Sequence, residues 1–349
     1  MSMGLLRHKS MRLAALWGSM ALSAMMLPGT ASAQTEIKFS LEMFEGDNPE
    51  YNAAMRFKNY VESKSNGELK VRLFPGNQLG SARDTTEMVQ QGTLEMAFPS
   101  DGALAGFYKP IQAWSIPYLF TSAPVAWEVM NSEFGRWMLK DIREKTGMRA
   151  LAFSQNGFRS FTNNTRPIIT PKDMAGLKIR TMESPVYMEL VKALGASPTP
   201  IAGSEVVMAL KQGVVDGQEN PPSVVYSGGA GDVQKYYTLN EHILGVHIII
   251  ASDKWFNSLS PSHQRIVTDA AQVMALTENL EKTEADWVYA QKLAKEKGMK
   301  IHVSTPQEKE QFRAAVKEPV QAYITQQVGK DLVDRLSGAV KAAEEKLYR

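Results

Sequence analysis

Four segments between residues 156 and 220 decide how the fold of this chain is interpreted. They read NGFRSFTNNTRPI (156–168), TPKDMAGLKIR (170–180), ALGASPTPI (193–201) and ALKQGVVDGQEN (209–220). Within the second, Leu177–Arg180 is a short run typical of a strand, and Arg180 stands at its carboxyl end. Because open α/β sheets bind ligands at the carboxyl ends of their strands, we expect Arg180 at a ligand site.

Three polar residues of these segments suit a carboxylate ligand. The guanidinium of Arg180 offers a planar fork that matches a carboxylate with two parallel hydrogen bonds. Arg159 and Asn220 can also donate hydrogen bonds, whereas a carboxylate only accepts them. The alternative for either arginine is an ordinary surface or salt-bridged position, since most arginines are exposed.

The chain before these segments alternates between strand and helix patterns. Strands are predicted at 37–41, 68–74, 94–98 and 148–153, and helices from Pro49, around 82–91 and at 126–145. This alternation is typical of a mostly parallel sheet in an α/β fold.

The chain after these segments returns as a strand at 243–251 and then forms long helices. No proline or glycine interrupts residues 262–297, so Ser260-Pro261 is predicted to begin a helix of about 55 Å, longer than a small domain is wide. Terminal helices follow from Thr305-Pro306. With the sheet regions split near Asn156 and Val246, the chain crosses at least twice between two lobes, as in a hinged binding protein with its ligand between them.

The N-terminus has the pattern of a secretory signal peptide. A basic region (7–12) precedes an apolar core (13–27), and Ala31-Ser32-Ala33 is a small-residue cleavage site. We expect cleavage after Ala33, which places the protein in the periplasm. The alternative, a membrane anchor, needs about 20 apolar residues.

Composition and motifs argue against several other classes of protein function. The net charge of +2 gives no electrostatic case for nucleic acid, and the absence of cysteine excludes thiolate chemistry. There is no G-x-S-x-G elbow or Walker A loop. The five histidines form no compact metal set. We therefore expect no cofactor and no metal. His247, on the returning strand, is a candidate ligand contact whose alternative is a packed, hydrogen-bonded residue.

Seven motifs along the chain resemble one protein family in both sequence and order. They are QLGSARD (78–84), IPYLF (116–120), NGFRSFTNNTRPI (156–168), GLKIR (176–180), ALGASPTP (193–200), GVVDGQENP (213–221) and VQKY (233–236). The chain resembles the substrate-binding proteins of tripartite ATP-independent periplasmic (TRAP) transporters, of the DctP type, from about Ile37 to the C-terminal helices.

The resemblance assigns roles to the candidate residues. It implies that Arg180 clamps the ligand carboxylate, that Arg159 supports it and that Asn220 hydrogen-bonds to it. Gly203 stands where many members carry an aromatic residue that packs on the ligand, which leaves extra room. Ser100, at the start of the segment after strand 94–98, is added to the candidate contacts.

Two acids bear on the identity of the ligand. Glu42 and Glu183 stand at positions that often approach the ligand in this family, and the alternative is a pair of unrelated surface acids. If both face the cleft, they repel a second carboxylate. The sequence then favours a sugar acid such as a uronate over a C4-dicarboxylate, with amino acids and aromatic acids left open.

The resemblance also implies partners and an organisation. We expect a monomer that delivers an organic acid to the small and large subunits of an ion-driven TRAP permease. The expected division is a signal peptide (1–33), lobe I (34–155 with 247–283) and lobe II (156–246 with 284–349). The alternatives are a secreted hydrolase or lyase that uses Glu42, Glu183 and His247 as acid–base groups, and a ligand-presenting partner of a membrane sensor.

Overall fold

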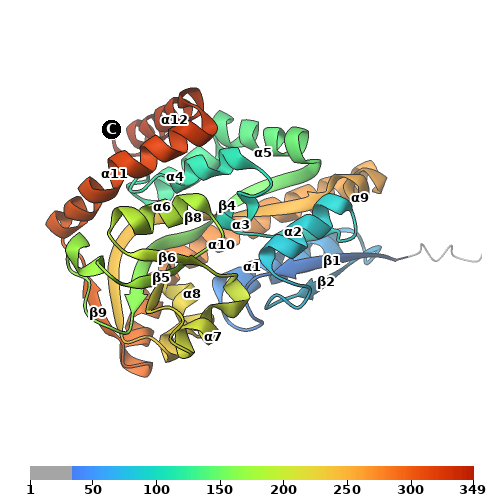
Figure 1. The fold of residues 1–349 in the computed structure, drawn as a ribbon. Coiled ribbons are helices and arrows are strands. Elements are labelled where there is room, and N and C mark those ends of the chain that lie inside the picture. Colours follow the sequence, from blue (N-terminus) through green and yellow to red (C-terminus); the bar gives the residue numbers. More distant parts are fainter. Residues whose placement is uncertain (1–33) are drawn as a thin grey trace, which may run out of the picture. The chain divides into compact units, whose positions relative to one another are not determined.

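The computed structural model describes residues 34–349, which form one compact unit, and the predicted signal peptide lies outside these residues. One sheet runs through this unit in the strand order β2-β1-β3-β8-β4-β7-β5-β6, with β9 paired to β8 (Figure 1). The strands are β1 (Thr35–Leu41), β2 (Leu69–Phe74), β3 (Met96–Phe98), β4 (Met148–Asn163), β5 (Lys178–Thr181), β6 (Ser197–Pro200), β7 (Gly217–Asn220), β8 (Tyr236–Ser252) and β9 (Lys300–Val303).

The sheet is parallel toward its two ends and antiparallel at its centre. β1 pairs in parallel with β2 and β3, and β5 with β6 and β7. Between them, β8 is antiparallel to both β3 and β4, and β4 is antiparallel to β7. The α/β class is confirmed, and the sheet is mixed, because β9 also pairs in parallel with the central strand β8.

Strands β4 and β8 are much longer than the runs 148–153 and 243–251 predicted from the sequence. β4 continues through the NGF segment because the β4–β8 ladder absorbs irregularities there, with a register shift between Gln155 and Gly157. Gly157 has a φ of +109°, which a residue with a side chain rarely adopts. Residues 156–163, which begin lobe II in the expected division, are therefore the second half of one continuous strand.

Helices cover both faces of this sheet. They are α1 (Pro49–Lys64), α2 (Ala82–Gln91), α3 (Asp101–Leu104), α4 (Ala123–Asn131), α5 (Glu133–Thr146), α6 (Pro185–Ala193), α7 (Val206–Lys211), α8 (Pro222–Ser227), α9 (Asp253–Ser258), α10 (Pro261–Glu296), α11 (Pro306–Val328) and α12 (Lys330–Tyr348). The single helix predicted over 126–145 is wrong, because Ser132 is extended and its hydroxyl caps a new helix, α5. A side chain at Gly135 would lie 1.9 Å from the carbonyl oxygen of Met130, so only glycine allows this close junction.

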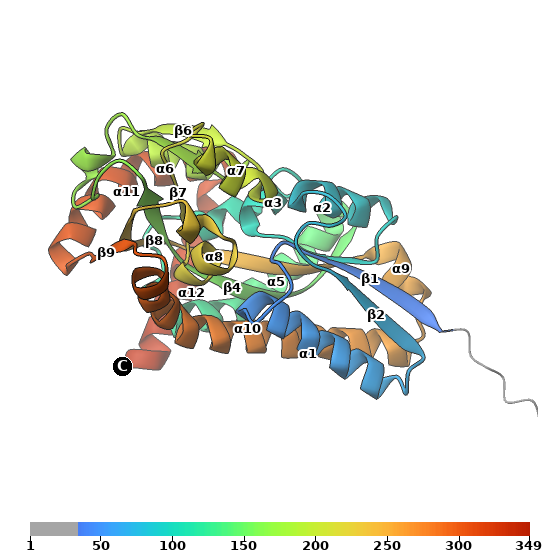
Figure 2. The same cartoon turned by 90° about the horizontal axis from the view of Figure 1, so that it is seen from below.

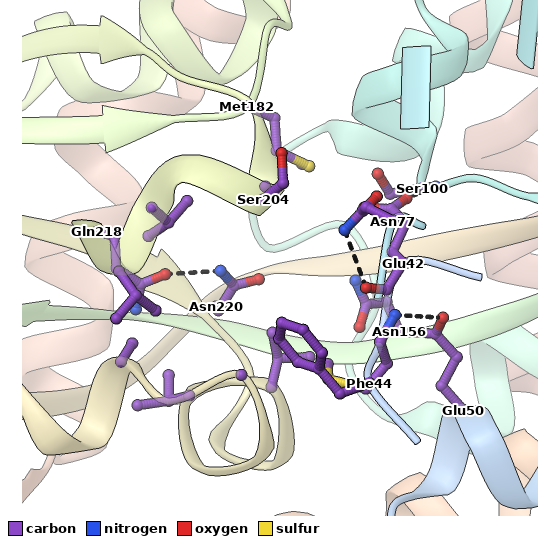
Figure 3. A pocket seen from close by; sticks show the side chains of 18 of the residues that line it. Glu42, Phe44, Glu50, Asn77, Ser100, Asn156, Met182, Ser204, Gln218 and Asn220 are labelled. Atoms are coloured by element: carbon purple, nitrogen blue, oxygen red, sulfur yellow. Dashed lines mark hydrogen bonds between the residues drawn. The ribbon is translucent and has the colours of Figure 1, made fainter. Parts of the chain in front are cut away.

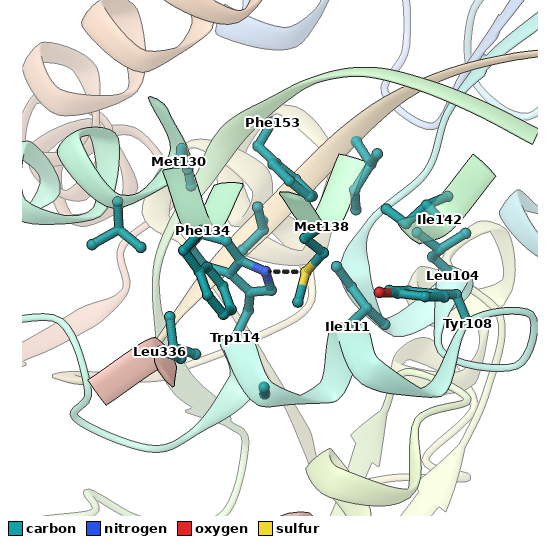
Figure 4. Close-up of a cluster of buried hydrophobic side chains, with 14 of the residues drawn as sticks. Leu104, Tyr108, Ile111, Trp114, Met130, Phe134, Met138, Ile142, Phe153 and Leu336 are labelled. Atoms are coloured by element: carbon teal, nitrogen blue, oxygen red, sulfur yellow. Dashed lines mark hydrogen bonds between the residues drawn. The ribbon is translucent and has the colours of Figure 1, made fainter. Parts of the chain in front are cut away.

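A large aromatic cluster supports the central strands from one side (Figure 4). Trp114 is fully buried there, stacks on Phe120 and contacts Phe134 and Phe153. Its indole N–H donates to the sulfur of Met138 at 2.9 Å. Helix α12 adds Leu332, Leu336, Val340 and Ala343 to the same cluster, so the end of the chain packs back on α4 and α5.

Helix α10 joins two hydrophobic clusters that, apart from β8, are built from different elements. Its 36 residues span about 54 Å, beside α1 for part of their length (Figure 2). The residues from Val267 to Ala275 pack with β1, β2 and α1, whereas Ala290 and Leu293 pack with α7, α8 and the start of β8. The predicted long helix is confirmed. Among residues 34–349, no helix is both long and apolar enough to cross a membrane.

Candidate functional site

A cavity of about 270 Å³ gathers most of the predicted site residues. Figure 3 labels Glu42, Ser100 and Asn220 among the side chains that line it. Of the eight candidates, all except Glu183 line it: Glu42, Ser100, Arg159, Arg180, Gly203, Asn220 and His247. Glu183 lies instead on a smaller neighbouring cavity, which shares Glu42, Ser100, Arg180 and Gly203 with the first. The described part of the chain contains no group of three or more His, Asp or Glu side chains suited to hold a metal ion.

Arg180 brings a buried positive charge to this cavity. It lies on β5, one residue before the carboxyl end of the strand, and is only 3 % exposed. Its Nε donates to the carbonyl oxygen of Ile201 at 2.8 Å, and it forms no salt bridge with another described residue. Burial lowers the pKa of Arg180 to about 10, which leaves the guanidinium charged at neutral pH. A charged group that is buried without a partner favours an anion beside it.

Arg159 is already paired. Its Nε and Nη2 donate to the two carboxylate oxygens of Glu219 at 2.6 and 2.7 Å, and both side chains are shielded from solvent. Burial alone would raise the pKa of Glu219, but the Arg159 charge and hydrogen bonds lower it to about 2. The remaining nitrogen, Nη1, is buried and has no hydrogen-bond partner among the described residues. One donor of Arg159 is thus unused.

Asn220 lines the cavity with its amide engaged by a neighbour. Its Nδ2 donates to Oε1 of Gln218 at 2.6 Å, and its backbone carbonyl accepts from the hydroxyl of Tyr237. Gln218 also lines the cavity and donates to Thr162. The two amides therefore form a chain of hydrogen bonds from β7 to Thr162 on β4, and the second N–H of the Asn220 amide stays available to a ligand.

Glu42 is fixed by neighbouring residues on its own side of the cavity (Figure 3). Its Oε1 accepts from the N–H of Ser100 at 2.8 Å, and its backbone carbonyl accepts from Asn77. A methyl group placed on Gly203 would lie 3.6 Å from Oε2 of Glu42 and 4.0 Å from Nη2 of Arg180. The absence of a side chain at Gly203 thus leaves open space between the Glu42 carboxylate and the Arg180 guanidinium.

Replacing Gly203 by leucine should shrink the site without unfolding the protein. The distances above are ordinary contacts, and the backbone at Gly203 is not in the left-handed region. We expect roughly tenfold or weaker binding of six-carbon sugar acids, a size effect typical of a filled pocket, with a smaller loss for succinate. Calorimetry measures both, and Gly203→Ala serves as the milder variant. Equal losses for the two acids would place Gly203 outside the size-selective part of the cavity.

His247 belongs to a buried polar cluster beneath the cavity. Its Nδ1 lies 2.8 Å from Oε1 of Glu278 on α10, and Oε2 of Glu278 accepts from the hydroxyl of Ser154. Burial would lower the pKa of His247, but the Glu278, Glu50 and Glu42 charges raise it. His247 is therefore both a packed, hydrogen-bonded residue and a wall of the cavity.

Several lining residues were not among the predicted contacts. The polar ones are Glu50, Asn77, Asn156, Ser204 and Gln218, and the apolar ones include Phe44, Met182, Val207 and Val224. Asn156 and Gln218 lie inside the segments quoted at the outset, so their positions in those motifs were a usable signal. No sequence signal pointed to Glu50 as a site residue, because an acid in the first turn of a helix is explained by the helix dipole alone.

Comparison with known proteins places this architecture in one family. Residues 42–327 match the family model DctP, described as bacterial extracellular solute-binding protein, family 7.

Individual relatives cover most of the chain. The C4-dicarboxylate-binding periplasmic protein DctP of Rhodobacter capsulatus is 35% identical over 70% of this chain and 73% of its own. The 2,3-diketo-L-gulonate-binding periplasmic protein YiaO of Escherichia coli is 32% identical over 69% of this chain and 73% of its own. The sugar acid binding protein DctPAm of Advenella mimigardefordensis, solved with galactonate, superposes with a TM-score of 0.85 at 29% identity, over 89% of this chain and 99% of its own.

Proposed function

The chain belongs to the DctP family, the periplasmic solute-binding proteins of TRAP transporters, and we propose that its cavity captures an organic acid for delivery to a membrane permease. The observation that carries this proposal is Arg180, a buried and charged guanidinium that faces the cavity without a carboxylate partner. A ligand carboxylate supplies that partner through two parallel hydrogen bonds.

Neighbouring donors complete the carboxylate site in this proposal. Arg159 contributes Nη1, the one guanidinium nitrogen that Glu219 leaves unused. Asn220 contributes the second N–H of its amide, whose other N–H is donated to Gln218. Ser100 holds Glu42 in place, and the open space at Gly203 accommodates the body of the ligand.

For the ligand itself, we propose a hydroxylated monocarboxylate such as a uronate in preference to a C4-dicarboxylate. Support comes from Glu42, whose carboxylate accepts hydrogen bonds from hydroxyl groups and repels a second carboxylate. Among the relatives, YiaO and DctPAm are named for sugar acids and the Rhodobacter protein for C4-dicarboxylates.

The two predicted acids provide a matched pair of variants for this choice. Glu42→Gln keeps the shape of the side chain and removes its charge, so succinate should gain affinity relative to galacturonate. Glu183→Gln is the comparison variant: Glu183 lies on the neighbouring cavity, where its charge acts on Arg180, so both Kd values should change by a similar factor and their ratio should change little. The measurement is the ratio of the two Kd values in wild type and both variants. A ratio that moves with Glu183 and not with Glu42 would reverse the roles of the two acids.

Delivery and location follow from the same assignment. We propose export through a signal peptide cut after Ala33 and delivery by a monomer to the small and large subunits of a TRAP permease. The two lobes are 34–155 with 247–283 and 156–246 with 284–349, with α12 packed back onto α4 and α5 of lobe I. Ligand bound between the lobes favours the closed form through the contacts that it makes to both.

An enzymatic role has no support in this site. The family and its structural neighbours are substrate-binding proteins. Of the three acid–base candidates, His247 is engaged by Glu278, and Glu183 lies outside the larger cavity.

A thermal-shift screen of residues 34–349 against organic acids tests the proposed function. An acid present at a thousandfold above its Kd should stabilise the protein by about 4 kcal/mol. The screen should include galacturonate, glucuronate, galactonate, succinate and malate, with the matching neutral sugars as controls. Stabilisation by neutral sugars and acids alike would contradict recognition through the carboxylate.

A further inference from the structure

Glu50 is a buried acid of the cavity that the proposed carboxylate site does not use. It lies in the first turn of α1, is 2 % exposed and lines the cavity near Asn156 (Figure 3). Its Oε1 accepts from the N–H of Met43 at 2.9 Å. Its other oxygen forms no hydrogen bond with any described residue, so half of this carboxyl group is available to whatever fills the cavity.

The ionisable groups around Glu50 come from three other elements and are mostly acidic. They are Glu42 after β1, Glu278 on α10 and His247 on β8. The one base among them, His247, lies at hydrogen-bond distance from Glu278 rather than Glu50. Lys282 of α10 donates to Asn156, which also lines the cavity, and to Ser223. An ionised Glu50 would therefore be a buried anion without a cation of its own.

Protonation relieves this unfavourable arrangement. Burial, followed by the Glu278 and Glu42 charges, raises the pKa of Glu50 to about 7 against the opposing effect of His247. At neutral pH the group lies near its midpoint, so a modest change in its surroundings decides whether it carries a proton.

Resting on the proposed function, we propose that Glu50 is a specificity-determining residue that is protonated in the complex and donates its hydrogen to a neutral oxygen of the bound acid. That oxygen belongs to a hydroxyl or carbonyl group, while the ionised carboxylate of the ligand pairs with Arg180. Filling the cavity excludes water and makes an ionised Glu50 still less favourable. Above the midpoint, the proton comes from solvent, and binding of the acid takes up one proton.

Ligand affinity should fall as the pH rises above the midpoint of Glu50. Below the midpoint Glu50 already holds its proton, and affinity changes little with pH through this group. Above it, each complex must acquire a proton, so the Kd rises about tenfold per pH unit. Glu50→Gln keeps the acceptor for Met43 and supplies a permanent donor, so its affinity should be nearly independent of pH through this residue.

Calorimetry of residues 34–349 with D-galacturonate tests this proposal. Titrations at pH 5.5 and 8 in buffers of different ionisation enthalpy count the protons taken up. We expect uptake approaching one at pH 8 and near zero at pH 5.5 in wild type, and near zero at both in Glu50→Gln. Glu281→Gln is the matched control, because Glu281 is also an acid on the α1–α10 side whose pKa burial raises, but it does not line the cavity. It should behave as wild type.

The outcomes separate this proposal from the proposed function. Galacturonate that binds without proton uptake at pH 8, or uptake that persists in Glu50→Gln, overturns the role of Glu50 alone. If neither galacturonate nor succinate binds at any pH, the proposed function fails. Thermal unfolding without ligand then decides whether Glu50 carries the proton. A gain in Tm for Glu50→Gln that is larger at pH 8 than at pH 5.5 supports it, and equal gains contradict it.

Discussion

Replacing Arg180 by alanine is expected to weaken binding of the carboxylate ligand by roughly 30-fold to several-thousand-fold. Truncating one partner of a buried charge pair costs about 2–5 kcal/mol, since the other charge stays buried without its partner. Arg180 is well suited to such an effect, because it is buried, lines the cavity and forms no salt bridge with the described protein. The free protein should be little harmed, because the substitution removes a buried charge that has no partner of its own.

Arg180→Lys is the informative companion variant. An ammonium keeps the charge but cannot form the two parallel hydrogen bonds of a guanidinium. We expect a loss of affinity in Arg180→Lys that is smaller than in Arg180→Ala, measured by calorimetry with the same acid. Near-unchanged Kd values for both variants would exclude Arg180 as the carboxylate clamp.

Glu219→Ala should strongly destabilise the fold, by about 3–5 kcal/mol, because it leaves Arg159 charged and buried without its partner. The carboxylate holds Arg159 through two short hydrogen bonds and also lies 3.4 Å from His242. Denaturant unfolding measures the loss. Glu241→Ala is the control, because Glu241 pairs with Lys309 at the exposed surface, where such pairs contribute at most about 1 kcal/mol.

Two further measurements distinguish the lost charge pair from lost packing. Replacing both residues, as Arg159→Met with Glu219→Met, should recover much of the stability, since no unpaired charge remains. The pKa of Glu219 falls from an ordinary value of 4.5 to about 2 in the fold. Its contribution, on the order of 3 kcal/mol, is therefore fully present above pH 4.5 and is lost as the pH falls toward 2. A double variant as unstable as Glu219→Ala would argue for packing instead.

Local sequence signals predicted the helix starts well. Asn48 and Ser260 each accept a hydrogen bond at the start of a helix, and proline follows directly after both. The prediction over 126–145 was wrong because an apolar helical pattern continues through Ser132. The break there depends on a close approach between Met130 and Gly135 that the periodicity does not record.

The candidate site likewise contains some residues that local sequence signals identified and others that they did not. Arg180 was found from its place at a strand end, and the structure places it in the cavity. Glu183, three residues further on, was assigned by its position in the family, and the turn toward α6 directs it to the neighbouring cavity. Glu50 was missed because its significance depends on the acids and the histidine that surround it from three other elements.

The class of fold, the family and the kinds of side chain available for a carboxylate can be predicted from the order of the amino acids alone. These follow from periodicity, caps and motifs, which are properties of neighbouring residues. Which charges meet depends on the three-dimensional fold. Arg159 pairs with Glu219 and His247 with Glu278, whereas Arg180 and Glu50 have no charged partner of their own. Such pairs join residues that are 31 to 60 positions apart in the chain. Their contact depends on strand register and on how α10 crosses the sheet, and burial then fixes the protonation state of each group.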